Sequence, residues 1–525
     1  MNRIFSAQGY RFYQSSYDED LEGSWLSVNY DPWGTGITYT GFCLMGLGCL
    51  LLLCARDGGF RRLLRHPLIR KGGLFLIALF WGCQLKADPA LPVVKLVQAD
   101  SLAIQQVVYN DRVAPFNTLA RDFVQKIYGR PSFHGITPEQ VVSSWMLYPE
   151  EWNRTPIIRI KNQELRTALG LKEEYASLNH LFDGTQYKLQ PLWQREQGNR
   201  SKLAQAIQET DEKVGLILML RQGTLVRPLP PDVPHLSTQK VNAELWYNRI
   251  PFSKILFMVN LTLGFAAFGL FMFRMLTGRK EKAVSRRVWG TALCLTTLFH
   301  ATGYALRGYI RGGFPLSNGY ETMQFVALAV LLTACLLQRR FPFTRPFGFL
   351  LSGFTLLVAY LGEMNPQITP LMPVLASPWL SWHVSLIMIS YGLFAFTFLN
   401  GILALCLIGK QKNTASPITG EQIEQLTLLS RLLLYPGTFL LGTGIVLGAV
   451  WANVSWGSYW SWDPKEVWAL AAFIIYGISF HRKSLPYFQH PWLFHGYMIL
   501  AFAVVLMTYF GVNYLLGGMH SYANS

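Results

Sequence analysis

Residues 456–470 read WGSYWSWDPKEVWAL. This stretch places four tryptophans within thirteen residues, interrupts them with Asp463-Pro464-Lys465-Glu466, and lies between two long apolar runs. Tryptophan and tyrosine gather singly at membrane interfaces, so an aromatic belt is one interpretation. Here, however, the aromatic residues share one short loop, which a Trp-Asp-Pro turn would fold back on itself. We therefore predict a flat apolar platform with a polar rim, a surface that suits a large planar ligand.

The composition indicates a membrane protein. Of the 525 residues, 51% are hydrophobic and only 14% are charged, which argues against an ordinary soluble globular chain. The net charge of +16 would suit a nucleic-acid partner, but the Lys and Arg residues fall in short clusters between apolar runs, as topology control requires. We therefore expect membrane lipid around the chain and no nucleic-acid partner.

Apolar runs predict an all-α polytopic membrane protein with about ten transmembrane helices. The candidate spans are residues 36–55, 72–85, 252–275, 288–306, 322–338, 347–362, 381–408, 432–451, 467–481 and 491–516. Basic clusters recur at every second loop, so the positive-inside rule places those loops in the cytoplasm and both termini outside. This pattern predicts a multi-pass protein of the cytoplasmic (inner) membrane whose active face is on the outer side.

The segments between the spans divide the chain into three predicted parts. Residues 1–86 carry two spans after a polar tail, in which residues 24–28 alternate as a strand does, and we expect no cleavable signal peptide. Residues 87–250 read as a small external soluble domain, with helical patterning at 116–128 and 164–178, and residues 251–525 form a membrane domain with eight spans. None of the seven cysteines forms a C-x-x-C pair, which argues against a dithiol shuttle and against haem attached covalently to this chain.

The pattern W-G-x-x-W-x-W-D-P-K-E-x-W, from Trp456 to Trp468, resembles the tryptophan-rich signature of the haem-handling proteins of cytochrome c biogenesis, the CcsA/ResC family. Residues 252–522 resemble that family throughout, whereas residues 10–55 look like the C-terminal end of a ResB/CcsB-type protein. The resemblance implies that residues 1–86 are a ResB-like C-terminal remnant. Either a separate ResB/CcsB-like membrane partner supplies the rest, or the chain is a shortened fusion.

The predicted topology brings two histidines to the face that carries the Trp-rich loop. His383 stands at the outer end of span 381–408, and His520 follows the last span. Neutral imidazole is a favoured haem ligand, so we predict haem b on the tryptophan surface with His383 and His520 as the two axial ligands of its iron. The family resemblance points to the same two residues. The alternative is a pair of interfacial histidines that hydrogen-bond lipid headgroups. The remaining residues of the predicted haem-binding surface are Trp456, Trp460, Trp462, Asp463 and Trp468.

Two further histidines are candidates for contact with haem. His481 lies at the inner end of span 467–481, and the resemblance implies that it helps to receive haem at the cytoplasmic side. The family's usual partner histidine lies in an early span of the ResB-type half, but residues 36–55 and 72–85 contain no histidine. His300, in span 288–306, is the local alternative, and a role in helix packing is its other interpretation.

An outer loop, residues 307–321, contains the sequence Pro315-Leu316-Ser317-Asn318-Gly319-Tyr320-Glu321, which resembles the family's P-x-S-N-x-Y-E segment. Arg307 or Arg311 could pair there with a haem propionate in a bidentate contact. A capped helix start explains the same sequence equally well.

The resemblance implies a role in cytochrome c maturation of the system II type, as part of a haem lyase complex. Haem would be presented for thioether attachment to the CxxCH motif of apocytochrome c, with thiol-reducing proteins as further partners. No side chain of this chain needs to act as a nucleophile, and Asp463 and Glu466 would shape the loop or assist proton transfer. Two alternatives remain: a haem exporter without ligation activity that works through His481, and a lipid-linked glycosyl or acyl transferase that uses Asp463 or Glu466 as its catalytic carboxylate.

Overall fold

A computed structural model describes most of the chain. The described residues are 5–17, 24–31, 33–55, 58–64, 91–184, 186–199, 201–277, 279, 281–362, 364–369, 377–413 and 417–516. The predicted span 72–85 and His520 lie outside these residues.

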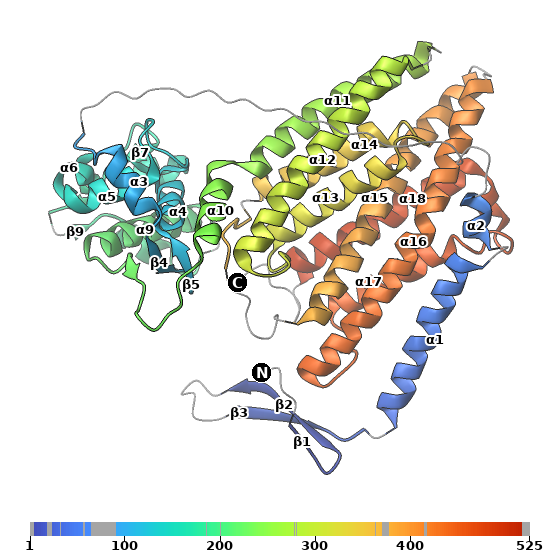
Figure 1. The fold of residues 1–525 in the computed structure, drawn as a ribbon, viewed down its shortest axis with the longest axis horizontal. Helices are drawn as coiled ribbons and strands as arrows, with labels where there is room; N and C mark the ends of the chain where they lie inside the picture. The colour runs from blue at the N-terminus through green and yellow to red at the C-terminus, as the bar shows by residue number, and fades with distance from the viewer. Residues whose placement is uncertain are drawn as a thin grey trace.

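The N-terminal tail folds as a small antiparallel sheet ahead of the first long helix. Its strands are β1 (Phe5–Ala7), β2 (Tyr10–Tyr17) and β3 (Ser24–Asn29), in the order β1-β2-β3. The strand expected at residues 24–28 is therefore confirmed. The helices α1 (Gly34–Cys54) and α2 (Gly59–Leu64) follow. Figure 1 shows the sheet at one end of α1 and α2 at the other.

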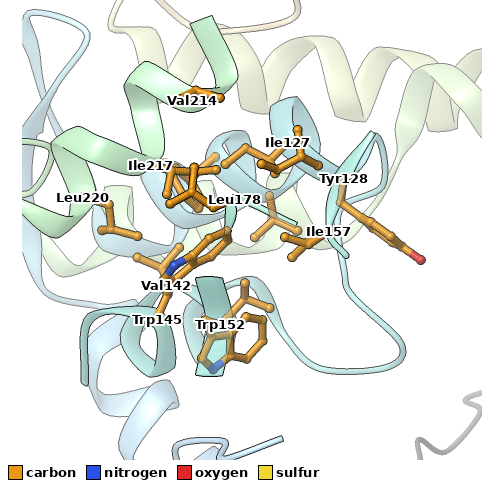
Figure 2. Close-up of a cluster of buried hydrophobic side chains, with 14 of the residues drawn as sticks. Ile127, Tyr128, Val142, Trp145, Trp152, Ile157, Leu178, Val214, Ile217 and Leu220 are labelled. Atoms are coloured by element: carbon orange, nitrogen blue, oxygen red, sulfur yellow. The ribbon is translucent and has the colours of Figure 1, made fainter. Parts of the chain in front are cut away.

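Residues 91–249 form a unit with its own hydrophobic core. Trp145 and Trp152 are fully buried at its centre with their ring centroids 5.8 Å apart (Figure 2). The elements of this unit are α3 (Leu96–Ala103), β4 (Gln106–Tyr109), β5 (Arg112–Pro115), α4 (Phe116–Tyr128), α5 (Pro138–Leu147), α6 (Pro149–Arg154), β6 (Ile158–Arg159), α7 (Gln163–Ala168), β7 (Tyr175–Ala176), η2 (Asn179–Leu181), β8 (Phe182–Asp183), β9 (Gln186–Tyr187), α8 (Leu189–Glu196), α9 (Lys202–Arg221), β10 (Arg227–Pro228) and α10 (Thr238–Arg249).

Of the two helices expected in this unit, one is confirmed and one is too long. Helix α4 covers the predicted residues 116–128 and ends at Gly129, whose φ of +81° is the left-handed conformation of a helix C-terminus. The helix expected at 164–178 ends at Ala168. Gly170 adopts a φ of +68° just beyond it, and residues 175–176 pair with β6 as a strand. The helix was predicted too long because apolar residues recur at helical spacing beyond Ala168, where the chain forms a turn and then a short strand.

The described residues from 251 onward are mainly helical and confirm the all-α polytopic class. Its elements are α11 (Phe252–Thr277), α12 (Ala283–Arg311), α13 (Gly319–Leu337), α14 (Thr344–Leu361), α15 (Pro378–Asn413), α16 (Pro417–Trp456), α17 (Pro464–Ile478), η4 (Pro486–Gln489), α18 (Pro491–Leu506) and η5 (Met507–Leu516). Within the described residues, seven helical segments are long and apolar enough to cross a membrane: Gly34–Leu63, Phe252–Met275, Gly319–Leu337, Thr344–Leu361, Pro378–Gln411, Gly420–Ser455 and Pro491–Leu516.

Two of the expected spans are helices but are not among these seven. Helix α12 covers span 288–306 and carries four arginines along its 29 residues, which lowers its mean hydropathy. Helix α17 covers most of span 467–481 but has only 15 residues. That is about 22 Å of helix, less than the roughly 30 Å thickness of a bilayer core.

Helices α15 and α16 lie side by side at the centre of the helical region (Figure 1). Polar side chains join them inside the apolar contact: the Ser390 hydroxyl donates to the carbonyl oxygen of Gly437 at 2.8 Å, and the Asn400 amide donates to the Ser430 hydroxyl at 3.1 Å. In lipid the hydrophobic effect does not drive helices to associate, so interhelical hydrogen bonds and the close packing of small residues hold them together. This helix pair carries His383 and leads into the Trp-rich loop.

Candidate functional site: the Trp-rich loop and His383

His383 lies in the first turns of α15 and faces α16. Its ring nitrogen Nδ1 is 2.6 Å from the backbone carbonyl oxygen of Gly444. A carbonyl oxygen can only accept a hydrogen bond, so Nδ1 carries the proton and donates it. When the imidazole is neutral, its lone pair is therefore on Nε2. Histidines that bind metals are commonly oriented in this way, by a hydrogen bond from the other ring nitrogen.

Glycines on α16 allow this close approach. A Cβ atom at Gly448 would lie 2.6 Å from the ring of His383, and one at Gly444 would lie 2.7 Å from the side chain of Ile387. Larger residues at either position would push the two helices apart. From Gly448, α16 continues eight residues to Trp456. His383 is therefore about 12 Å, or two helical turns, along α16 from the start of the Trp-rich loop.

Asp463 and Glu466 hold the turn between the loop and α17. Asp463 is the N-cap residue, and its Oδ1 accepts a hydrogen bond from the backbone N–H of Lys465 at 3.0 Å. Glu466 Oε2 accepts from the backbone N–H groups of Ser461 at 2.8 Å and Asp463 at 3.3 Å. With Pro464 as the first helical residue, this is a reciprocal capping box. Both carboxylates therefore accept hydrogen bonds that shape the loop.

The indole rings of the loop do not form one flat platform. The rings of Trp460 and Trp462 are 6.0 Å apart between centroids and 88° apart in plane. Trp462 is 72% exposed and has a φ of +59°. Trp456 ends α16, and its side chain lies outside the described part of the structure. The predicted flat surface is therefore corrected for this pair, because aromatic rings favour edge-to-face packing, and the loop offers two apolar faces at right angles.

The C-terminal element packs on the helix that follows the loop. The Thr508 hydroxyl of η5 (Met507–Leu516) is 3.3 Å from the backbone carbonyl oxygen of Trp468 in α17. Residues of η5 form a π-helix, a form that is frequent at functional sites. His520 follows four positions after Leu516 and lies outside the described residues. The structure thus brings the element that precedes His520 to the helix that carries Trp468.

The N-terminal sheet contacts the loop across 428 positions of sequence. The Asn29 amide donates a 3.0 Å hydrogen bond to the carbonyl oxygen of Gly457. Gly457 has a φ of +80°, and a Cβ atom there would lie 2.7 Å from the ring of Tyr13. The ring of Tyr459 also packs nearly perpendicular to that of Tyr39 from α1, with the ring centroids 5.9 Å apart. The sheet and α1 therefore hold the loop from outside the helix pair.

Lys465 gives the loop a group that titrates near neutral pH. Burial lowers the pKa of Lys465 from 10.5 to about 8, and the neighbouring Asp463 carboxylate opposes this by raising it. Lys465 lies in the first turn of α17, ahead of the apolar residues of that helix. The Asp463 carboxylate is the opposite charge that acts on its ammonium group.

The other two candidate histidines lie elsewhere. His481 is exposed in the turn that follows α17. His300 is 1% exposed on α12, where its Nε2 is 3.0 Å from Gln324 Oε1 of α13. Gln324 in turn donates to the hydroxyl of Ser253 on α11 at 2.8 Å. These contacts join three helices, as the helix-packing interpretation of His300 expects.

The arginines of the outer loop are engaged in an internal network. Arg307 Nε and Arg311 Nη1 contact the two oxygens of Glu321 at 2.8 and 2.7 Å, and Arg307 also donates to the carbonyl oxygens of Pro366 and Gln367 at 2.7 and 2.9 Å. The Asn318 side chain caps α13 by accepting from the Glu321 N–H at 2.9 Å. With Arg307 1% exposed, these contacts favour the capped-helix interpretation over a propionate contact.

Sequence reasoning missed the residues that position His383 and the loop. Gly444 and Gly448 are four apart and so lie on one face of α16, which is a recognisable sign of close helix packing. The sequence gives no sign that Asn29 and Tyr13 contact the loop, because their contacts with Gly457 depend on how the N-terminal sheet docks.

The fold and the site define a polytopic helical membrane protein with an aromatic loop beside a histidine that is oriented by a backbone carbonyl. The family model "Cytochrome C assembly protein" matches residues 316–520. The chain is 33% identical to the cytochrome c biogenesis protein CcsA of Synechococcus sp. (strain WH7803), over 50% of this chain and 94% of CcsA. It is 32% identical to CcsA of Prochlorococcus marinus (strain NATL2A), over 50% of this chain and 93% of CcsA.

A longer relative matches the whole chain. Protein NrfI of Wolinella succinogenes is 32% identical over an alignment that covers 100% of this chain and 66% of NrfI, so the chain spans just under two thirds of NrfI's length. The nearly complete coverage of CcsA shows the family. The chain belongs to the CcsA family of cytochrome c biogenesis proteins.

Proposed function

We propose that this chain holds haem at the Trp-rich loop, with His383 and His520 as axial ligands of the iron, and presents it to apocytochrome c for covalent attachment. The observation that carries the proposal is the 2.6 Å hydrogen bond from His383 Nδ1 to the carbonyl oxygen of Gly444. It leaves the lone pair on Nε2, and it fixes the ring against α16 about two turns from the loop. Membership of a cytochrome c biogenesis family supports haem as the substrate.

The loop supports the proposal through its shape. Trp462 is exposed, and Trp460 meets it edge to face, so a planar ligand can stack on one indole while its edge contacts the other. The haem bound in this way is a non-covalent haem b. The capping box and the N-terminal sheet keep the loop in one conformation, which reduces the entropy lost when haem binds.

Attachment requires positioning more than side-chain chemistry. Each cysteine thiol of a CxxCH segment adds across one haem vinyl group, so that the sulfur forms a C–S bond and the thiol proton passes to the other vinyl carbon, with no net change of oxidation state. The histidine of the same segment replaces one protein ligand on the iron. The part of this chain is to hold the vinyl groups near the incoming thiols.

The partners follow from this chemistry. Apocytochrome c supplies the CxxCH segment, and thiol-reducing proteins keep its cysteines reduced. A ResB/CcsB-like membrane partner completes the haem lyase complex, with residues 1–86 as the ResB-like remnant. The loop and both termini face the outer side of the cytoplasmic membrane, as the basic clusters of the opposite loops favour. His481 then lies at the cytoplasmic end of α17, where it would first meet haem.

A lipid-linked transferase is disfavoured by the loop's own hydrogen bonds. Such an enzyme would use Asp463 or Glu466 as a catalytic carboxylate. Glu466 Oε2 accepts hydrogen bonds from two backbone N–H groups, and Asp463 is 5% exposed and caps α17. Carboxylates committed in this way hold a turn and are poorly placed to exchange protons with a substrate.

Haem content and ligation test the proposal directly. The chain is purified from membranes with and without a ResB-like partner, as the parent and as His383→Ala and His520→Ala forms, and its ferrous absorption spectrum is recorded. His235→Ala, an exposed histidine of the soluble unit, is the matched control. We expect a bis-histidine spectrum in the parent and in the control. Both ligand variants should lose this spectrum, and cells that carry them should also lose thioether-linked cytochrome. A parent without haem under either condition would overturn the proposal.

A further inference from the structure

A cavity of about 300 Å³ lies where α2 packs beside α16, with η4 and α18 completing its walls. Figure 1 shows α2, which forms one of its walls, beside α16 at the end of α1 that is far from the N-terminal sheet. Its lining residues come from α2, α16, the turn after α17, η4 and α18, and they are Gly59, Arg62, Leu63, Arg431, Leu434, Tyr435, Ser479, Phe480, Arg482, Phe488 and Phe494. Arg431 precedes Trp456 by 25 residues of one helix, so the cavity is about 37 Å along α16 from the Trp-rich loop.

The lining is strongly cationic. Arg62, Arg431 and Arg482 contribute three guanidinium groups, and no aspartate or glutamate is among the lining residues. Arg431 is half-buried, and its guanidinium lies over the ring of Phe494 at 5.2 Å. Within the described residues, no carboxylate forms an ion pair with any of these three arginines. Guanidinium groups gathered around one cavity repel one another, and an anion placed between them would be attracted by all three.

The rest of the lining suits an amphiphile. The ring of Phe480 lies 4.8 Å from that of Tyr435, and Leu63 and Leu434 add aliphatic surface. The hydroxyl of Tyr435 lies against Gly59, where any side chain would collide with it. Glycine at this position therefore lets α2 close the wall of the cavity.

The lining does not suit iron. It contains no histidine, cysteine or methionine. His481, the residue proposed to meet haem first, stands between the lining residues Phe480 and Arg482, but it is exposed and does not line the cavity. The nearby His495 is buried, and its Nε2 is 2.9 Å from the hydroxyl of Thr427. Guanidinium groups match phosphate oxygens through paired N–H donors, and basic pockets between transmembrane helices are known to recognise phosphate headgroups.

We propose that this cavity binds a phosphate group, carried by an anionic phospholipid or by a free phosphate compound, through Arg62, Arg431 and Arg482. The phosphate lies between the three guanidinium groups. When it belongs to a lipid, the glycerol and first acyl carbons run along Leu63, Leu434 and the aromatic rings. The cavity shares no residue with the Trp-rich loop or with His383.

The full-length chain in neutral detergent tests this site by the shift of its thermal unfolding midpoint. Phosphatidylglycerol, phosphatidylcholine or inorganic phosphate is titrated into the parent and into Arg431→Gln and Arg482→Gln. Arg287→Gln, an exposed arginine of α12, is the matched control. Arg482 lies at the exposed rim, so its variant is informative even where Arg431→Gln fails to fold.

We expect phosphatidylglycerol, and not phosphatidylcholine, to stabilise the parent and the control. Each cavity variant should weaken the apparent affinity about tenfold, because a charge-assisted hydrogen bond contributes roughly 1.5 kcal/mol or more. The same dependence with inorganic phosphate would identify a free phosphate compound as the ligand. Equal responses in all variants, no response to either phosphate, or an arginine-dependent response to haem alone would each overturn the proposal.

Discussion

The hydrogen bond that orients His383 depends on two glycines that carry no chemistry themselves. Gly444 supplies the accepting carbonyl oxygen, and Gly448 supplies the space for the ring. A histidine alone on an apolar helix would choose among several rotamers and two tautomers, and each alternative would move or remove the lone pair of Nε2. The hydrogen bond to the backbone of α16 selects one rotamer and one tautomer of His383.

Gly448→Ala should therefore disturb His383 without removing it. The added Cβ would lie 2.6 Å from the ring, closer than real Cβ contacts, so the ring or the helix must shift. We expect a destabilisation of about 1–3 kcal/mol, as for overpacked cores, together with a weaker haem spectrum. Gly409→Ala in α15 is the control, because a Cβ there meets nothing within 4 Å. Equal thermal midpoints and spectra for both variants would contradict the tight packing.

Lys465 should titrate near pH 8, well below an ordinary lysine. Burial disfavours its charged form in the folded loop, so the unfolded loop binds more protons between about pH 8 and 10.5, and the loop becomes more stable as pH rises through that window. The pH dependence of the ¹³C shift of reductively methylated lysines measures this pKa. Lys465→Arg, which lacks the resonance, assigns it. A midpoint of 10 or above would show that the side chain is solvated.

At the scale of elements, two separate contacts control the surroundings of the loop. The sheet β1-β2-β3 reaches the loop through Asn29 and Tyr13, and η5 reaches α17 through Thr508. The first contact comes from the N-terminal part of the chain and the second from its C-terminal part. Segments near both ends of the described chain therefore pack against residues 456–470.

Asn29→Ala should loosen the sheet from the loop. The variant removes the donor to the Gly457 carbonyl, a bond that contributes about 1 kcal/mol, and leaves the strands themselves paired. Hydrogen exchange in detergent should show faster exchange at residues 457–463, with little change in the core of α15. Ser27→Ala, at an exposed position of the same strand, should leave exchange in the loop unchanged. The absence of any difference between the two variants would show that the sheet does not hold the loop.

Glu321→Gln should strongly destabilise the helical region. The carboxylate is 1% exposed and pairs with both Arg307 and Arg311, so the amide would leave two cations with reduced compensation. Removing one partner of a buried ionic pair costs about 3–5 kcal/mol. We expect a large fall in the thermal midpoint. Glu421→Gln, at an exposed position of α16, is the control, and a comparable midpoint in both variants would argue against the network.

Across the whole molecule, the long apolar helices and the capped turn before α17 were predictable from the sequence. The apolar runs identified the seven long helices, because burial in lipid depends on length and composition more than on partners. The turn before α17 was also readable, since Asp463-Pro464 followed by Glu466 matches a capping box. Helix α12, with its arginines, and helix α17, with its 15 residues, are the marginal cases.

The contacts between distant segments could not be read in the same way. Neither the register of α15 against α16, which places His383 on Gly444, nor the docking of the N-terminal sheet on Gly457 follows from local periodicity. The relative angle of Trp460 and Trp462 depends on backbone dihedrals inside the loop, including the positive φ of Trp462. Each of these is a property of packing, and hydrophobic patterns do not specify it.

The most direct test of the central claim is the spectrum and reduction potential of bound haem in His383→Met, measured beside the parent. If His383 ligates the iron, the thioether should replace one imidazole, and the pair should acquire the spectrum of His/Met coordination with a higher reduction potential. An unchanged bis-histidine spectrum and an unchanged potential would contradict the claim, because they would mean that the iron is held by other residues.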